Sequence, residues 1–264
     1  MATSETGGSD PFVDYYVQES VSPRTVERFQ AIMDAVLRVR KAEALPLEAL
    51  KVADIGCNTG TQSLMWANRG HAVYGLDINE GLIAVARSRS EQAGKDVEFS
   101  LGSATSLPWQ TASMDVAILP ELLEHVEDWQ SCLDEGCRVL KAGGTLFLST
   151  TNALCPVQAE FDLPLYSWFP RPLKRYYERL SVTTRPELVN HAKYPAVHWF
   201  TTHGLSAYLR ARGFVPFDRF DMMDTAGKSA LKRFVIGTIR AVPPIRWLGH
   251  VLTPYTAIVA KKTV

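Results

Sequence analysis

Short apolar runs and amphipathic segments alternate along the chain from residue 51 to residue 149. Five runs of strand length carry mostly aliphatic side chains, and the segments between them place apolar residues at helical spacing. The predicted strands cover residues 51–55, 72–76, 97–101, 116–119 and 145–149. The predicted helices cover residues 61–68, 80–93 and 129–140. Because such units connect parallel strands by right-handed crossovers, the pattern predicts a doubly wound, mostly parallel α/β sheet with helices on both faces.

Two longer segments interrupt this alternation in the C-terminal half. Residues 151–197 are rich in proline and aromatic side chains, and residues 221–253 mix cations with apolar side chains. The alternation resumes around them with a helix at 202–212 and strands at 214–220 and 255–260, which brings the predicted sheet to seven strands. We therefore expect the two segments to be helical lid insertions on one domain.

The N-terminal part is predicted to be a tail followed by a helix. Ser22 is a capping residue, and Pro23 fits the first turn of a helix. Apolar residues recur at helical spacing after it. We expect residues 1–21 to form a flexible tail and residues 22–264 to form the single domain.

The composition favours a globular cytoplasmic protein. Of its 264 residues, 46% are hydrophobic and 21% are charged, and the net charge is +0. Because phosphate neutralisation needs an excess of cations, this balance argues against nucleic acid as the main partner. The four cysteines form no C-x-x-C pair, so we interpret them as reduced thiols. The chain begins without the apolar stretch of a signal peptide, and no run is long enough to span a bilayer.

A glycine loop follows the first predicted strand. Gly56 and Gly60 allow a ligand to approach the backbone closely, and Asp77 at the end of the second strand can accept hydrogen bonds from ribose hydroxyls. The spacing is not the G-x-G-x-x-G of a dinucleotide site, and Asn58 stands in its middle. Asp54 would repel a pyrophosphate but could help to hold a cationic amino-acid group. S-adenosylmethionine has such a group and carries no phosphate.

Four motifs in this order resemble those of the class I S-adenosylmethionine-dependent methyltransferases, which have a Rossmann-like fold. They are Val52-Ala53-Asp54-Ile55-Gly56-Cys57-Asn58-Thr59-Gly60, Gly75-Leu76-Asp77, Leu107-Pro108 and Leu140-Lys141-Ala142-Gly143-Gly144. The resemblance spans residues 50–150 and implies S-adenosylmethionine as the cofactor. It implies that Asp77 binds the ribose, that Ile78 packs against the adenine and that Gly56 leaves room for the methionine portion. The family often has Asp where this chain has Ser103. The implied cofactor contacts are Asp54, Gly56, Cys57, Asn58, Gly60, Asp77, Ile78, Ser103, Ala104 and Pro120.

A group of two carboxylates and an imidazole follows the fourth predicted strand. In a helix, Glu121, Glu124 and His125 would fall at positions i, i+3 and i+4 and point to one face. Such a set can hold a divalent cation, and its oxygen ligands suit Mg²⁺ or Mn²⁺, with Zn²⁺ as an alternative. A metal would lower the pKa of a bound hydroxyl, whereas His125 could instead act directly as a general base.

The same stretch, Glu121-Leu122-Leu123-Glu124-His125, resembles the ubiquinone-biosynthesis O-methyltransferases, which methylate phenolic hydroxyls on polyprenylated rings. The resemblance implies that the two glutamates and the histidine are metal ligands. It also implies that Arg28, in the predicted N-terminal helix, contacts the cofactor.

The two insertions should select the acceptor. Their mixture of cations and aromatic side chains favours a small phenolic or lipid-like acceptor, and it could also bring the protein into peripheral contact with a membrane. Other readings of the sequence are a methyltransferase for sugars or natural-product scaffolds, an RNA methyltransferase, and a cofactor-binding protein without catalysis. No pattern in the sequence indicates an oligomeric state.

Overall fold

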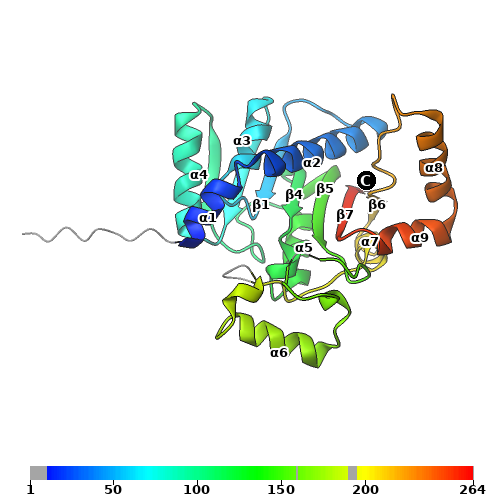
Figure 1. Ribbon diagram of the computed structural model, residues 1–264. Coiled ribbons are helices and arrows are strands. Elements are labelled where there is room, and N and C mark those ends of the chain that lie inside the picture. Colours follow the sequence, from blue (N-terminus) through cyan, green and yellow to red (C-terminus); the bar gives the residue numbers. More distant parts are fainter. Residues whose placement is uncertain (1–10, 159, 190–194, 264) are drawn as a thin grey trace, which may run out of the picture.

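The protein is built around one seven-stranded sheet (Figure 1). The computed structural model describes residues 11–158, 160–189 and 195–263. The strand order is β3-β2-β1-β4-β5-β7-β6, and β7 alone runs opposite to the other six strands. The strands are β1 (Lys51–Ile55), β2 (Ala72–Asp77), β3 (Val97–Leu101), β4 (Met114–Pro120), β5 (Leu140–Thr151), β6 (Phe214–Asp218) and β7 (Tyr255–Lys262). The prediction of a mostly parallel, doubly wound sheet is confirmed.

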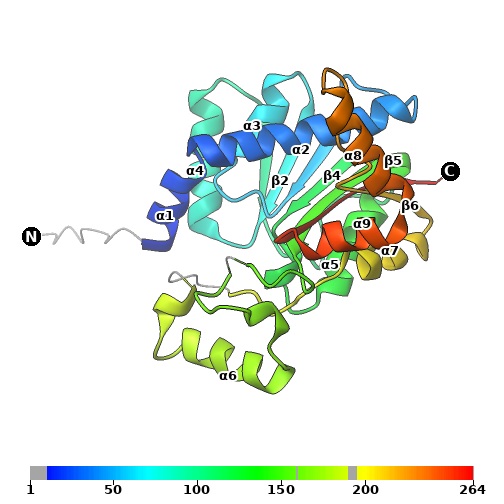
Figure 2. The same cartoon turned by 45° about the vertical axis from the view of Figure 1, so that its right-hand side comes forward.

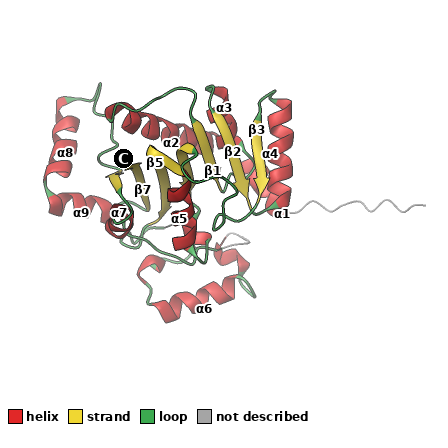
Figure 3. Cartoon of the chain, turned by 180° about the vertical axis from the view of Figure 1, so that it is seen from behind, coloured by secondary structure: helices red, strands yellow, loops and turns green. Residues whose placement is uncertain are grey.

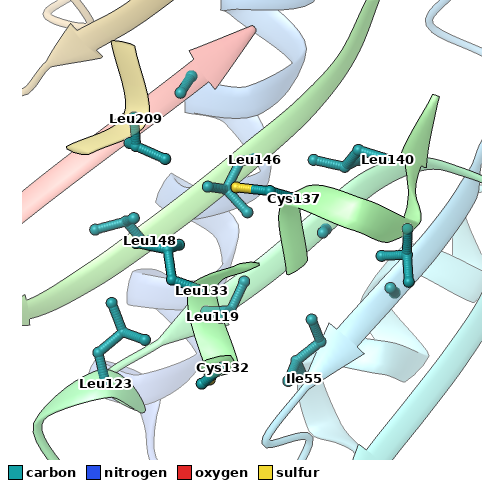
Figure 4. Packing of buried hydrophobic residues seen from close by; sticks show 14 of the residues in the cluster. Ile55, Leu119, Leu123, Cys132, Leu133, Cys137, Leu140, Leu146, Leu148 and Leu209 are labelled. Carbon is teal, nitrogen blue, oxygen red and sulfur yellow. The ribbon is translucent and has the colours of Figure 1, made fainter. Parts of the chain in front are cut away.

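Helices cover both faces of this sheet (Figure 2). They are α1 (Pro11–Glu19), α2 (Pro23–Ala42), α3 (Thr61–Asn68), α4 (Glu80–Gln92), α5 (Trp129–Val139), α6 (Arg171–Ser181), α7 (Thr202–Arg210), α8 (Ala230–Ala241) and α9 (Pro243–Val251). Side chains of α2 and α3 share one buried apolar cluster with the sheet. Side chains of α5 and α7 share a second cluster on the opposite face, and Figure 4 shows its packing. No helix in the described ranges is long and apolar enough to cross a membrane.

The N-terminal segment differs from the expected tail. Residues 1–10 lie outside the described part of the chain, but helix α1 begins at Pro11 and packs against α4. A β-carbon on Gly81 of α4 would lie 2.9 Å from the Val13 side chain, so the two helices approach closely. The boundary expected at residue 21 is therefore too late, because α1 finds a packing partner that is distant in the sequence.

The two insertions take up different places. Figures 1 and 3 show α6 beyond the carboxyl ends of the parallel strands, whereas α8 and α9 lie beside the β6–β7 edge. Helix α9 is fixed to the end of β6 because Asp218 accepts hydrogen bonds from Arg246 and His250, both at 2.8 Å. We had expected both insertions to act as lids, and only the first one lies at the strand ends.

Of the two glycines in the loop after β1, Gly60 leaves less room for a side chain. Its φ is +77°, and an added β-carbon would lie 2.8 Å from the Phe99 ring and 3.0 Å from the Ala86 methyl group. Gly70 has a similar φ of +83° but no atom within 4 Å of that position. We expect Gly60→Ala to lower the free energy of unfolding by about 1–3 kcal/mol more than Gly70→Ala does, because only Gly60→Ala adds overpacking. Urea unfolding of both variants tests this difference, and equal losses would contradict it.

Candidate active site

A cavity of about 600 Å³ opens at the carboxyl ends of β1, β2, β3 and β4. Its walls come from the loops after these strands and from one face of α1. The lining residues include Phe12, Tyr16, Gly56, Asn58, Asp77, Ile78, Asn79, Gly102, Ser103, Ala104, Pro120, Glu121, Leu122 and His125. In an open parallel sheet this edge is the place where ligands bind. We call this space the first cavity.

Asp77 is held in a fixed position at the floor of the first cavity. Its Oδ2 accepts a hydrogen bond from the Asn58 amide at 2.9 Å, and its Oδ1 accepts one from the Asn79 amide at 2.9 Å. Burial raises the pKa of Asp77 above its ordinary value, although both amides act against this rise. Each carboxylate oxygen keeps a further lone pair, so Asp77 can accept hydrogen bonds from a vicinal diol.

The loop after β1 brings its backbone to the cavity wall. Gly56 has a φ of +77° and Asn58 has a φ of +51°, both in the left-handed region. Asparagine is among the few residues that tolerate this region, and its Oδ1 accepts a hydrogen bond from the Thr59 amide at 2.7 Å. Asn58 therefore replaces a glycine of the family pattern without disturbing the loop.

Asp54 lies behind the loop rather than in the cavity. It is 1% exposed, and it accepts a hydrogen bond from the Ser63 hydroxyl at 2.5 Å. Burial raises the pKa of this carboxyl from 3.8 to about 7, and the nearby Asp77 adds to the rise. The predicted direct contact between Asp54 and a ligand is therefore wrong for this conformation, because the side chain points into the protein to bond with α3.

The buried Asp54 makes the stability of the protein depend on pH. Since its pKa is higher in the folded than in the unfolded state, the folded state binds more protons between about pH 4 and pH 7, and stability from this group is lost as the pH rises through about 7. We expect Asp54→Asn, which can still accept the Ser63 hydrogen bond, to be more stable than the wild type at pH 8. The difference should vanish near pH 4. Denaturant unfolding across this range measures it, and a difference that does not change with pH would contradict the account.

The other residues predicted for the cofactor divide into two groups. Those that line the first cavity are Gly56, Asn58, Asp77, Ile78, Ser103, Ala104 and Pro120. Cys57 and Gly60 do not line it but pack behind it, where Cys57 is 5% exposed and Gly60 faces Phe99. Arg28 lies outside it as well, because its guanidinium pairs with Glu121 and lines a neighbouring cavity.

Two aromatic residues of α1 complete the first cavity and were not among the predicted site residues. Phe12 and Tyr16 stand four positions apart and share one face of the helix. Burial raises the pKa of Tyr16 to about 12, and nearby carboxylates including Glu160 and Glu121 add to the rise. The sequence signal that could have revealed them is their i, i+4 spacing, which puts both side chains on the same face of a helix.

The three residues predicted to form one helical face do not do so. Glu121 has a φ of +51°, and only Leu123–His125 form a single 3₁₀ turn. Glu124 is fully buried and accepts a hydrogen bond from the Thr150 hydroxyl at 2.8 Å, and burial raises its pKa well above the ordinary value. Glu121 and His125 reach the first cavity.

These positions do not fit the predicted metal site. No group of three or more His, Cys, Asp or Glu side chains in the described ranges could hold a metal ion. The expectation failed because the strand continues to Pro120 and the chain then turns sharply at Glu121 instead of entering a helix.

A second cavity of about 680 Å³ lies between α2 and the strands β5 and β7. It combines apolar side chains with guanidinium groups from Arg24, Arg28, Arg38 and Arg219. Glu121 lines both cavities, so the two spaces lie next to each other at this residue. Its carboxylate pairs with the Arg28 guanidinium, which lines the second cavity.

Comparisons with known proteins agree with this fold. A family described as a methyltransferase domain matches residues 53–148. The demethylmenaquinone methyltransferase of Clavibacter sepedonicus is 33% identical over 215 residues, which cover 76% of this chain and 80% of that protein. The ubiquinone biosynthesis O-methyltransferase of Sinorhizobium medicae is 31% identical over 182 residues, which cover 64% and 71%. A protein of the same description from Chelativorans matches over 54% of its length.

Solved structures show the same fold at lower sequence identity. A SAM-dependent methyltransferase from Methanosarcina mazei has a TM-score of 0.54 at 22% identity, covering 85% of this chain and 97% of that chain. The magnesium protoporphyrin IX methyltransferase of Synechocystis with bound SAH has a TM-score of 0.52 at 17% identity, covering 97% and 90%.

A seven-stranded sheet with one antiparallel strand, a glycine loop after β1 and an acid at the end of β2 define a Rossmann-like fold with a cavity at the strand ends. With its relatives, the chain belongs to the class I S-adenosylmethionine-dependent methyltransferases.

Proposed function

We propose that this enzyme transfers a methyl group from S-adenosylmethionine in the first cavity to a hydroxyl oxygen of a phenolic, quinone-like acceptor in the second cavity. The observation that carries this proposal is that Glu121 lines both cavities. Methyl transfer needs the acceptor atom in line with the sulfonium methyl group, and adjoining sites allow this placement.

The residues of the first cavity suit the parts of the cofactor. Asp77, anchored by two amides, would accept the ribose hydroxyls. Ile78, which is 66% exposed, would be covered by the adenine. An added β-carbon on Gly56 would lie 3.1 Å from Leu122, so the glycine keeps this wall open for the methionine portion. The cofactor itself supplies the electrophilic methyl group.

His125 is the side chain we assign to proton removal. It lines the first cavity together with Glu121, and an imidazole has an ordinary pKa near neutrality. In the step, the acceptor O–H gives its proton to His125, the oxygen forms a bond to the methyl carbon, and the sulfur–carbon bond breaks. The sulfur keeps the electron pair, so a neutral thioether leaves.

The second cavity suits an acceptor that is apolar and carries a negatively polarised or anionic group. Phe147 and Ala257 of the sheet and Met222 supply apolar surface, while Arg24 and Arg219 supply positive charge. The relatives bear names that refer to ubiquinone and demethylmenaquinone, which are ring compounds of this chemical kind. This combination favours a quinone precursor over a sugar.

Methylation of a ring carbon is the second candidate. The Clavibacter relative is named as a methyltransferase of demethylmenaquinone, and the other relatives are named as O-methyltransferases. Both reactions use the same cofactor and need an activated ring hydroxyl, so the site accommodates either one.

The experiment is a methyl-transfer assay on polyprenyl catechols, demethylated naphthoquinols and sugars, with and without EDTA. Product mass spectrometry gives the acceptor, and NMR gives the atom methylated. We expect transfer to a ring hydroxyl that EDTA does not reduce, because Glu121, Glu124 and His125 do not gather as ligands. Transfer to a ring carbon would favour the second candidate, and turnover only on sugars would contradict both. Loss of turnover with EDTA, restored by Mg²⁺, would contradict the metal-independent reaction.

A further inference from the structure

Helices α8 and α9 expose an unusual number of large apolar side chains. Leu231 and Phe234 are each 72% exposed, and Leu252 is 69% exposed. Ile245, Trp247 and Leu248 are between 41% and 50% exposed. We call these six residues the α8–α9 surface. Figures 1 and 2 show both helices at the outer edge of the molecule.

The exposed side chains of α8 follow the spacing of one helical face. Leu231, Phe234 and Val235 stand at positions i, i+3 and i+4, so they form a single stripe. Ile236 lies off this stripe and is 8% exposed. The helix therefore buries one side against the protein and presents a second apolar side to its surroundings.

The charge of this region has one sign. Residues 225–264 contain seven Lys and Arg residues and no Asp or Glu. Arg240 and Arg246 turn inward, where Arg240 donates to the Phe220 carbonyl at 2.9 Å and Arg246 bonds to Asp218 at 2.8 Å. Lys232 and Arg233 remain exposed beside the apolar stripe.

We propose that the α8–α9 surface docks this enzyme onto an anionic lipid bilayer. A helix with Phe, Leu or Trp on one face and Lys or Arg beside it lies in the plane of a membrane interface, with the apolar face among the acyl chains and the cations at the headgroups. This proposal does not depend on the identity of the acceptor.

A second copy of this chain is a poorer partner for the same surface. In a two-fold dimer the same patch would face itself, and residues 225–264 of the second copy would offer no acid to pair with Lys232 and Arg233. Anionic headgroups supply the charge that this region lacks.

Hydrogen bonds connect helix α8 to the wall of the second cavity. Arg240 of α8 donates hydrogen bonds to the carbonyl oxygens of Asp221 at 3.1 Å and Met223 at 2.7 Å. Met222 and Met223 line the second cavity. Docking through α8 would therefore hold this cavity close to the bilayer.

The test is co-sedimentation of the full chain with vesicles of phosphatidylcholine alone or of an equimolar mixture with phosphatidylglycerol. We expect binding to the anionic vesicles and a loss of about tenfold or more in the double variant Leu231→Ser/Phe234→Ser. The variant Lys232→Glu/Arg233→Glu should lose binding to the same vesicles. A matched control is Leu47→Ser/Val215→Ser, which removes two side chains that are 37% and 41% exposed elsewhere.

Thermal unfolding and S-adenosylmethionine affinity, which we expect to be unchanged in all variants, verify that each one is folded. The proposal is overturned if the wild type does not bind anionic vesicles, or if the control loses as much binding as Leu231→Ser/Phe234→Ser. A dimer that forms without lipid and dissociates in Leu231→Ser/Phe234→Ser would assign the surface to a second copy instead. Because vesicle binding is measured without an acceptor, its failure is distinguishable from failure of the proposed reaction.

Discussion

Replacing Asp77 by alanine is expected to weaken the binding of S-adenosylmethionine by about two to four orders of magnitude. Two hydrogen bonds from ribose hydroxyls to a carboxylate contribute about 1.5–3 kcal/mol each, and alanine offers no acceptor. The loss should also loosen the loop, because Asp77 accepts hydrogen bonds from the Asn58 and Asn79 amides. Isothermal titration calorimetry of the purified variant measures the change in affinity.

Two further variants separate binding from folding. Asp77→Asn keeps one acceptor oxygen and should fall between the wild type and Asp77→Ala. Glu98→Ala removes an acid from the neighbouring strand β3 that does not line the first cavity, and it should leave the affinity unchanged. A folded Asp77→Ala variant that binds S-adenosylmethionine as tightly as the wild type would show that Asp77 does not hold the ribose.

The second large effect is expected for His125→Ala. Removal of a general base lowers a rate by about 10²- to 10⁴-fold, and we expect kcat to fall by this amount while the affinity for S-adenosylmethionine changes little. The loss should diminish at high pH, where a phenolic acceptor is ionised without help. A pH profile of kcat with the acceptor from the assay panel makes this comparison.

His203→Ala is the matched control for this experiment. His203 is exposed on α7 and does not line either cavity, so the variant should keep full activity. Full activity in His125→Ala would remove the histidine from the mechanism. A fall that is equal at every pH would indicate that His125 positions the acceptor without taking its proton.

The sequence predicted the core of the fold because its signals there are local. The apolar run ending at Ile55 and the glycine loop after it place a strand and a turn without reference to the rest of the chain. The position of Asp77 could be predicted in the same way, because an acid at the end of the second strand must lie at the carboxyl edge of the sheet. Of these residues, Gly56, Asn58 and Asp77 line the first cavity.

The site features that the sequence missed depend on contacts between distant segments. Glu124 is buried and accepts a hydrogen bond from Thr150, which is 26 positions away in the sequence. No local sequence pattern reveals this contact. Glu121 adopts a positive φ that is uncommon for a non-glycine residue, so a helical projection fails there. Arg28 forms an ion pair with Glu121, which is 93 positions away in the sequence, and its side chain does not line the first cavity.

The central claim is that the first cavity holds the cofactor and that its reactive end faces the second cavity at Glu121. The most direct measurement is a crystal structure of the protein with S-adenosylhomocysteine. We predict ribose hydroxyls within hydrogen-bond distance of Asp77, the adenine against Ile78 and the sulfur directed toward Glu121 and His125. A nucleoside bound elsewhere, or a sulfur directed away from the second cavity, would contradict the account.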